Sequence, residues 1–271
     1  MSELPQSCLL RLERAREHLD AFEIEARAFL DAQPYKRVIK KQNQPINETV
    51  FTYPDPPLRL SLIISDYLHE LRSCLDSLVF HLAGCPDDHK CRLQFPIFDD
   101  PYAYARKCKI KDGYLEGIPS EAEAVIERLQ PYNRPDYWDL PIPYVPGRMP
   151  LMWLHDLNRV DKHRTLHLMV RSVAMLGWWG ADIDFPAIDV FGPQKDDTNL
   201  QRLTDEVNVD VMPTFSVSFE DRWPTERMDN TPLYLRWFLD HVSNRVLPQF
   251  ERFFKDGVRI GGHFSGDPLL Q

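Results

Sequence analysis

The stretch from Leu58 to Ala83, LRLSLIISDYLHELRSCLDSLVFHLA, decides the fold class. A run of about 26 residues without glycine or proline is far too long for a strand. Pro56 and Pro57 precede it and Gly84 follows it, as expected before the first turn and after the last turn of a helix. Because its apolar residues cover a wide arc at three- and four-residue steps, we expect a central helix of a bundle.

Three polar residues share the other side of this helix. His69, Arg72 and Asp76 stand at i, i+3 and i+7, so they project from one side, one turn apart. A solvated face with an Arg-Asp ion pair is one interpretation. The other is that a second helix covers this face and encloses a polar site. Both interpretations stay open at the level of the sequence.

The composition indicates a folded protein without a broad nucleic-acid-binding surface. Of 271 residues, 43% are apolar and 11% aromatic, which is typical of globular chains and not of disordered ones. The 32 basic and 41 acidic residues give a net charge of −9, which disfavours extended nucleic-acid or anionic-membrane binding. A local basic patch remains compatible with this charge.

The sequence also predicts a location. We find no apolar run long enough for a transmembrane helix, so we expect no membrane partner. The first residues, MSELPQSCLL, lack the basic and apolar regions of a secretory signal. Five cysteines, an odd number without framework spacing, fit a reducing compartment. We therefore expect a cytoplasmic protein.

The remaining segments predict an α+β fold, a helical bundle core with an antiparallel β-sheet from the C-terminal half. Ser7 is expected to cap the first long helix, and Ser120 with Glu123 to form a capping box. We expect a helical domain over 1–165 with a small N-terminal hairpin, and strands plus a final helix over 166–271 on the same core or within one single domain. The expected helices are 7–32, 101–107, 120–129, 151–166 and 231–254, and the expected strands are 35–42, 48–54, 167–176, 182–193 and 206–221.

The segment 151–166, LMWLHDLNRVDKHRTL, supplies a second group of polar residues. If its helix packs against the central one, Arg72 and Asp76 orient His163, and Lys162 supplies charge for an anionic ligand or transition state. The alternatives are an ordinary solvated face and a purely structural network that fixes how two helices meet. The candidate catalytic residues are His69, Arg72, Asp76, Asp161, Lys162 and His163.

Metal binding is a further alternative. His163 and His167 stand four residues apart, a spacing that chelates a metal from one helix face. Cys85, His89 and Cys91 form a C-x3-H-x-C segment whose side chains zinc accepts. No cofactor is otherwise expected, because nucleotide-binding, hydrolase and metalloprotease motifs are missing from the sequence.

Three segments resemble a widespread set of bacterial proteins without an assigned function. These proteins carry a helix written His-x-Leu-Arg-Ser-x-Leu-Asp, then a Phe-Pro-Ile segment and an Asp-Lys-His-Arg helix. The matching residues here are His69 to Asp76, Phe95 to Ile97 and Asp161 to Arg164, and the resemblance covers roughly residues 5–170. The two helical motifs together are more specific than either alone.

The helical half also resembles HEPN-type domains more loosely. The resemblance implies a metal-independent ribonuclease or a defence or toxin-type protein, with RNA or another anionic ligand as partner. HEPN nucleases carry an R-x4–6-H motif. Three Arg-His pairs of this sequence match it, so the motif does not single out one pair as the active site. These pairs are Arg11 with His18, Arg148 with His155, and Arg236 with His241. The alternatives are a non-catalytic interaction or oligomerisation module with a structural polar network and a metal-dependent enzyme with a His cluster. We expect the protein to be a homo-oligomer.

Overall fold

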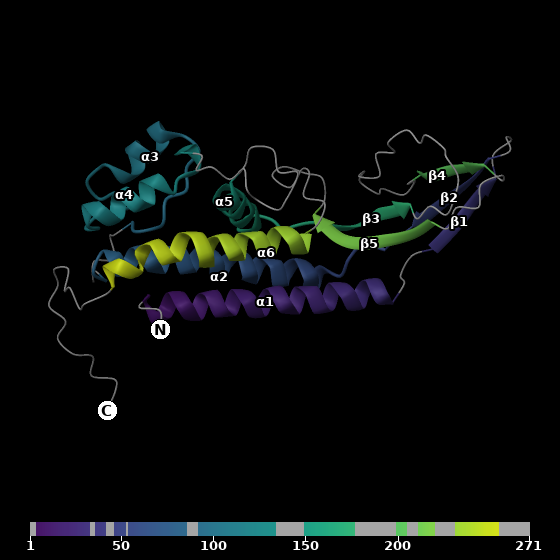
Figure 1. Ribbon diagram of the computed structural model, residues 1–271, viewed down its shortest axis with the longest axis horizontal. Helices are drawn as coiled ribbons and strands as arrows, with labels where there is room; N and C mark the ends of the chain where they lie inside the picture. Colours follow the sequence, from purple (N-terminus) through teal and green to yellow (C-terminus); the bar gives the residue numbers. More distant parts are fainter. Residues whose placement is uncertain are drawn as a thin grey trace, which may run out of the picture. The chain divides into compact units, whose positions relative to one another are not determined.

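A computed structural model describes residues 4–32, 36–41, 46–52, 54–85, 92–133, 149–176, 199–204, 211–219 and 231–254 of the chain (Figure 1). Within these residues, helices dominate and all paired strands are antiparallel, so the fold class is α+β. The helices are α1 (Gln6–Asp31), α2 (Leu58–Leu82), α3 (Pro101–Cys108), α4 (Ser120–Arg128), α5 (Pro150–Asp161) and α6 (Thr231–His241), with shorter turns η1 (Pro131–Asn133), η2 (Val242–Val246) and η3 (Leu247–Phe253).

The chain divides into two compact units, and each is built from several segments. The first unit comprises Met1–Glu17, Asp66–Arg159 and Arg236–Gln271, and the second comprises His18–Ser65 and Val160–Leu235. Four long helices therefore contribute residues to both units. The described part of the first unit is helical, whereas all the described strands belong to the second.

The C-terminal part of α2 forms the core of the first unit, as its wide apolar arc predicts. It contacts both neighbouring helices (Figure 1): Ser77 binds Ser7 of α1, and Tyr67 hydrogen-bonds the backbone of Leu239 in α6. Eight of its apolar side chains are almost completely inaccessible to solvent, whereas Phe80 is exposed. Truncating one such leucine to alanine costs about 2–5 kcal/mol in a typical core. The buried side chains are those of Tyr67, Leu68, Leu71, Cys74, Leu75, Leu78, Val79 and Leu82.

The end of α2 forms the predicted glycine cap. Gly84 has φ +77°, the left-handed conformation that glycine adopts without a steric penalty. Its amide donates to His81 O over 3.1 Å, and the Cys85 amide donates to Phe80 O over 3.0 Å. These two bonds define a Schellman motif, which satisfies the last carbonyls of the helix.

Two predicted helix caps do not form, although the helix predicted over 120–129 does begin at Ser120. α1 begins at Gln6 instead of after Ser7, because the carbonyl of Pro5 accepts hydrogen bonds from the amides of Cys8 and Leu9. The capping box at α4 does not form either. The amide of Glu123 already donates to Pro119 O over 2.9 Å, so it is not one of the unsatisfied amides that Ser120 was expected to cap.

The second unit holds two antiparallel sheets. β1 (Lys36–Lys41) and β2 (Ile46–Thr52) form the predicted hairpin, and β4 (Asn199–Thr204) pairs with β2 across a bulge at Glu48 and Thr49. β3 (Leu168–Leu176) pairs with β5 (Val211–Phe219), with Val170 opposite Val217. The hairpin thus contributes to a sheet that the sequence assigned mostly to the C-terminal half. The strand predicted over 182–193 lies outside the described residues.

The helix predicted over 151–166 is shorter than expected. α5 ends at Asp161, and residues 162–164 form a turn in which the amides of His163 and Arg164 both donate to Val160 O over 3.0 Å. β3 begins at Leu168, so the chain must turn between these positions.

Among the described helices, none combines the length and the apolar character that crossing a membrane requires.

Candidate functional site

Arg72 and Asp76 form a hydrogen-bonded network with the segment that precedes α3. Nη2 of Arg72 donates to Asp76 Oδ1 over 2.9 Å and to the carbonyl of Phe95 over 2.6 Å. Asp76 Oδ1 in turn accepts from the Phe95 amide over 2.9 Å. One residue of the Phe95-Pro96-Ile97 segment is therefore held through both of its backbone groups by the α2 pair.

The network is largely closed. The Arg72 side chain is 9% exposed and that of Asp76 is 35% exposed, while Phe95 is buried. Nε of Arg72 also points at Asp76 Oδ2, at 3.3 Å, and Nη1 has no hydrogen-bond partner within the described residues. A guanidinium that is this buried, and already engaged by a carboxylate and a carbonyl, mainly serves to position the backbone that it binds.

His69 lies on the exposed side of α2. Its Nε2 is 3.4 Å from the hydroxyl of Ser73, one turn along the helix. Glu70 beside it makes an ion pair with Arg11 of α1 at 3.0 Å. The polar face of α2 thus carries a buried arginine paired with the half-buried Asp76, and an outward-facing histidine.

The Asp161-Lys162-His163-Arg164 motif lies at the end of α5 and in the turn that follows. Asp161 accepts a hydrogen bond from the hydroxyl of Ser65 in α2. Lys162 and His163 are exposed, and so is Arg164. Residues 162–164, named the cationic turn here, therefore present basic side chains to solvent from a backbone fixed at both Asp161 and Val160.

The remaining polar residues of α5 lie in the first unit. Asp156 and Asn158 are buried, and Asp156 is 3.4 Å from the guanidinium of Arg159. Arg72 and Asp76 belong to the first unit, while Lys162 and His163 belong to the second. The predicted contact of Arg72 and Asp76 with Lys162 and His163 stays a prediction.

The predicted metal ligands fall into different settings. His163 lies in the cationic turn and His167 in the extended segment before β3, so the helical i, i+4 geometry expected for this pair is wrong. Cys85 directly follows the cap of α2, while His89 and Cys91 lie outside the described residues. Within the described parts of the chain, no three His, Cys, Asp or Glu side chains converge as a metal site would require.

The R-x4–6-H motif match at Arg236 and His241 does not form a joint exposed site. His241 is buried at the end of α6, whereas Arg236 is exposed. Burial and the nearby charge of Arg245 lower the pKa of His241 to about 4, so its imidazole is neutral at pH 7. A buried neutral histidine suits packing beside the irregular η2 segment better than proton transfer with a solvent-borne substrate.

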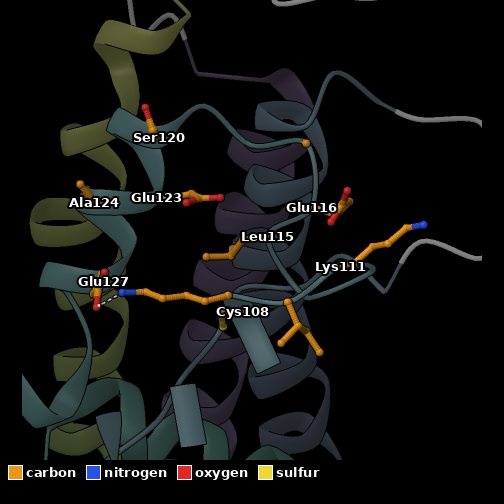
Figure 2. Close-up of a pocket in the computed structure, with 11 residues that line it drawn as sticks. Cys108, Lys111, Leu115, Glu116, Ser120, Glu123, Ala124 and Glu127 are labelled. Carbon is orange, nitrogen blue, oxygen red and sulfur yellow. Dashed lines mark hydrogen bonds and ion pairs between the residues drawn. The ribbon is translucent and has the colours of Figure 1, made fainter. Parts of the chain in front are cut away.

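A pocket of about 480 Å³ opens between the end of α3, the following loop and α4 (Figure 2). Figure 2 shows Glu123 projecting from α4 into the space that Leu115 borders, and Lys109 pairs with Glu127 at 2.9 Å. Burial raises the pKa of Glu123. None of the catalytic candidates named from the sequence lines this pocket.

Two sets of residues were missed at the level of the sequence. Gln130 is completely buried; its Oε1 accepts from the Phe98 amide, and its Nε2 donates to Pro96 O and Ile126 O. The second set joins the start of α1 to the end of α2. It consists of Ser7, Ser77, His81 and Cys85, named the Ser-His-Cys cluster here.

The i, i+4 spacing of His81 and Cys85 was a visible signal for this cluster. Its partner from α1 lies 74 residues from His81, and the sequence gave no signal for that contact.

No protein-family model, no curated protein and no solved structure matches the chain.

Proposed function

We propose that the chain binds RNA through the cationic turn and cleaves it without a metal, with His163 as the proton acceptor. This assignment rests on the HEPN-like resemblance together with one observation, the exposure of Lys162 and His163 on an anchored turn. Lysine and histidine next to each other supply a cation for a phosphate and a group for proton transfer.

The anchoring supports the proposal because pre-organised groups lose little conformational entropy on binding. Two amides of the turn bond the Val160 carbonyl, and Ser65 holds Asp161. A net charge of −9 gives RNA little general attraction to this chain. Binding therefore has to be local, and removal of a few cations at the turn should abolish it.

A cleavage assay tests this function. The full chain is incubated with a fluorescent single-stranded RNA in excess EDTA, and product is followed by gel electrophoresis. We expect His163→Ala to abolish cleavage and to leave the melting temperature nearly unchanged, because the side chain is exposed. His167→Ala, which alters another exposed histidine of the second unit that belongs to no R-x4–6-H pair, serves as the control and should retain cleavage. Cleavage that persists in His163→Ala would reject the proposal.

A second candidate function is a non-catalytic interaction module, and the Arg72–Asp76 network favours it. In this interpretation, the His-x-Leu-Arg-Ser-x-Leu-Asp helix owes its pattern to the fold, since Arg72 and Asp76 hold Phe95 in place. An interaction module of this kind would also account for the expected homo-oligomer. A protein that binds no RNA and sediments as a dimer in analytical ultracentrifugation would support it over the first.

A further inference from the structure

The Ser-His-Cys cluster is a continuous chain of four polar side chains within the first unit. Sγ of Cys85 lies 3.2 Å from Nδ1 of His81. Nε2 of the same imidazole lies 2.9 Å from Oγ of Ser7, which in turn lies 2.6 Å from Oγ of Ser77. All four residues are half-buried, so the thiol is within reach of solvent.

One arrangement of protons satisfies every hydrogen bond in the Ser-His-Cys cluster. The thiol donates to Nδ1 of His81, Nε2–H donates to Ser7, and the Ser7 hydroxyl donates to Ser77. In this arrangement the imidazole is neutral and its one lone pair faces sulfur. Burial lowers the pKa of His81 and raises the pKa of Cys85, so both groups are uncharged at pH 7.

The backbone fixes the thiol over the imidazole. The Schellman bonds from Gly84 and Cys85 close the end of α2 and fold the chain back onto its last turn. Cys85 has φ +53°, a conformation that residues with a side chain rarely adopt. Its neighbour Gly84 takes the ordinary capping position, so the left-handed turn extends one residue further and carries the cysteine.

We propose that Cys85 is a thiol nucleophile, His81 its general base and Ser7 the residue that positions His81, in a second site that acts on activated acyl groups, esters or thioesters. A nucleophile within hydrogen-bond reach of a base that a third group orients is the arrangement that covalent catalysis requires. This inference shares no residue with the RNA site, so the two stand or fall separately.

The reaction balances without an oxidant or a metal. As Sγ of Cys85 bonds to the carbonyl carbon, the thiol proton passes to Nδ1 of His81, and the bond to the leaving alcohol or thiol breaks as that group takes the proton. Water then attacks the acyl-cysteine, gives its proton to His81 and releases the acid, while the proton returns to sulfur. Ser7 accepts from Nε2–H throughout and so holds the imidazolium in place.

The probe is p-nitrophenyl acetate, applied to the full chain. The initial rate of cysteine acetylation is followed by quenching and peptide mass spectrometry. We expect acetyl on Cys85, loss of this product in Cys85→Ala, and a rate about 100-fold lower in His81→Ala, the lower end of what general-base catalysis contributes. Cys108→Ala removes a buried thiol of the same unit and should leave the rate unchanged.

The pH profile separates a general base from an ordinary thiol, even if His81→Ala unfolds. Because neutral His81 is the acceptor, the wild-type rate should be level above about pH 6.5, where the imidazole is deprotonated. Ser7→Ala should lower this pH-independent acetylation rate and Ser7→Thr should restore it, as expected of a positioning residue. An isolated thiol reacts in proportion to its thiolate, so its rate rises about tenfold per pH unit up to its pKa. Such a rise, or an unchanged rate in folded His81→Ala, would overturn the proposal.

Discussion

The guanidinium of Arg72 and the carboxylate of Asp76 lie 2.9 Å apart on α2, and together they bind both backbone groups of Phe95. An ion pair one turn apart on an exposed helix surface contributes little to stability. This pair differs because the arginine is enclosed and the segment that it holds is 19 to 23 residues away in sequence. The Leu-Arg-Ser-x-Leu-Asp pattern thus fixes a tertiary contact.

Removal of the carboxylate should destabilise the protein strongly. Asp76→Ala leaves the buried Arg72 charge without its partner, which typically costs about 3 kcal/mol or more. Urea unfolding followed by circular dichroism gives the free energy directly. The matched control is Glu17→Ala in the exposed Arg14–Glu17 pair of α1, where we expect a change within about 0.5 kcal/mol. Equal and small changes in both variants would show that the network does not support the fold.

Gln130 should matter for a different reason, the number of backbone groups that depend on it. Gln130→Leu has a similar volume but leaves the Phe98 amide and the Pro96 carbonyl without their partner. Unsatisfied buried groups cost about 1–3 kcal/mol each, so we expect a loss of about 2–4 kcal/mol in the same urea measurement. The same substitution at exposed Gln6 is the control and should be nearly neutral. A stable Gln130→Leu protein would mean that water replaces the amide without loss.

His241 should make the fold sensitive to acid. Its folded pKa of about 4 lies below the ordinary value of about 6.5, so the unfolded chain binds the proton more readily. The contribution of neutral His241 to the free energy of unfolding is fully present above pH 6.5. It is lost as the pH falls from 6.5 to about 4, a loss of about 3 kcal/mol.

The test compares melting temperatures at pH 7 and pH 4.5 for wild type and His241→Phe. Carboxylates elsewhere contribute to acid destabilisation in both proteins, so the difference between the two temperature shifts isolates His241. We expect the variant to lose less stability on acidification than wild type. Identical shifts would show that the buried imidazole is protonated without cost.

Local signals were sufficient for most of the helices and strands, although β4 was not predicted. Proline before and glycine after the Leu58–Ala83 stretch predicted α2, and the left-handed φ of Gly84 confirms the cap. The hairpin of β1 and β2 was predicted as two short strands over 35–42 and 48–54, and it is confirmed. These features depend on interactions within a few residues, which a sequence displays directly.

Contacts distant in sequence decided what was missed. Ser7 looked like a helix cap, but its hydroxyl binds Ser77 and His81, 70 and 74 residues away. The end of α5 was misplaced by about five residues, because nothing in the local pattern marks Asp161 as the position where Ser65 binds and the chain turns. Capping preferences describe isolated helix ends, and tertiary hydrogen bonds override them.

The salt dependence of RNA binding tests the central claim most directly, because it counts the phosphate contacts that the cationic turn makes. Fluorescence anisotropy with a labelled single-stranded RNA, at several salt concentrations in EDTA, gives the slope of log Kd against log salt. Each phosphate contact to single-stranded RNA contributes about 0.7 to that slope. We predict that Lys162→Ala weakens binding and reduces the slope by about this amount, while Lys107→Ala on exposed α3 changes neither. Equal slopes and affinities in wild type and Lys162→Ala would contradict the account.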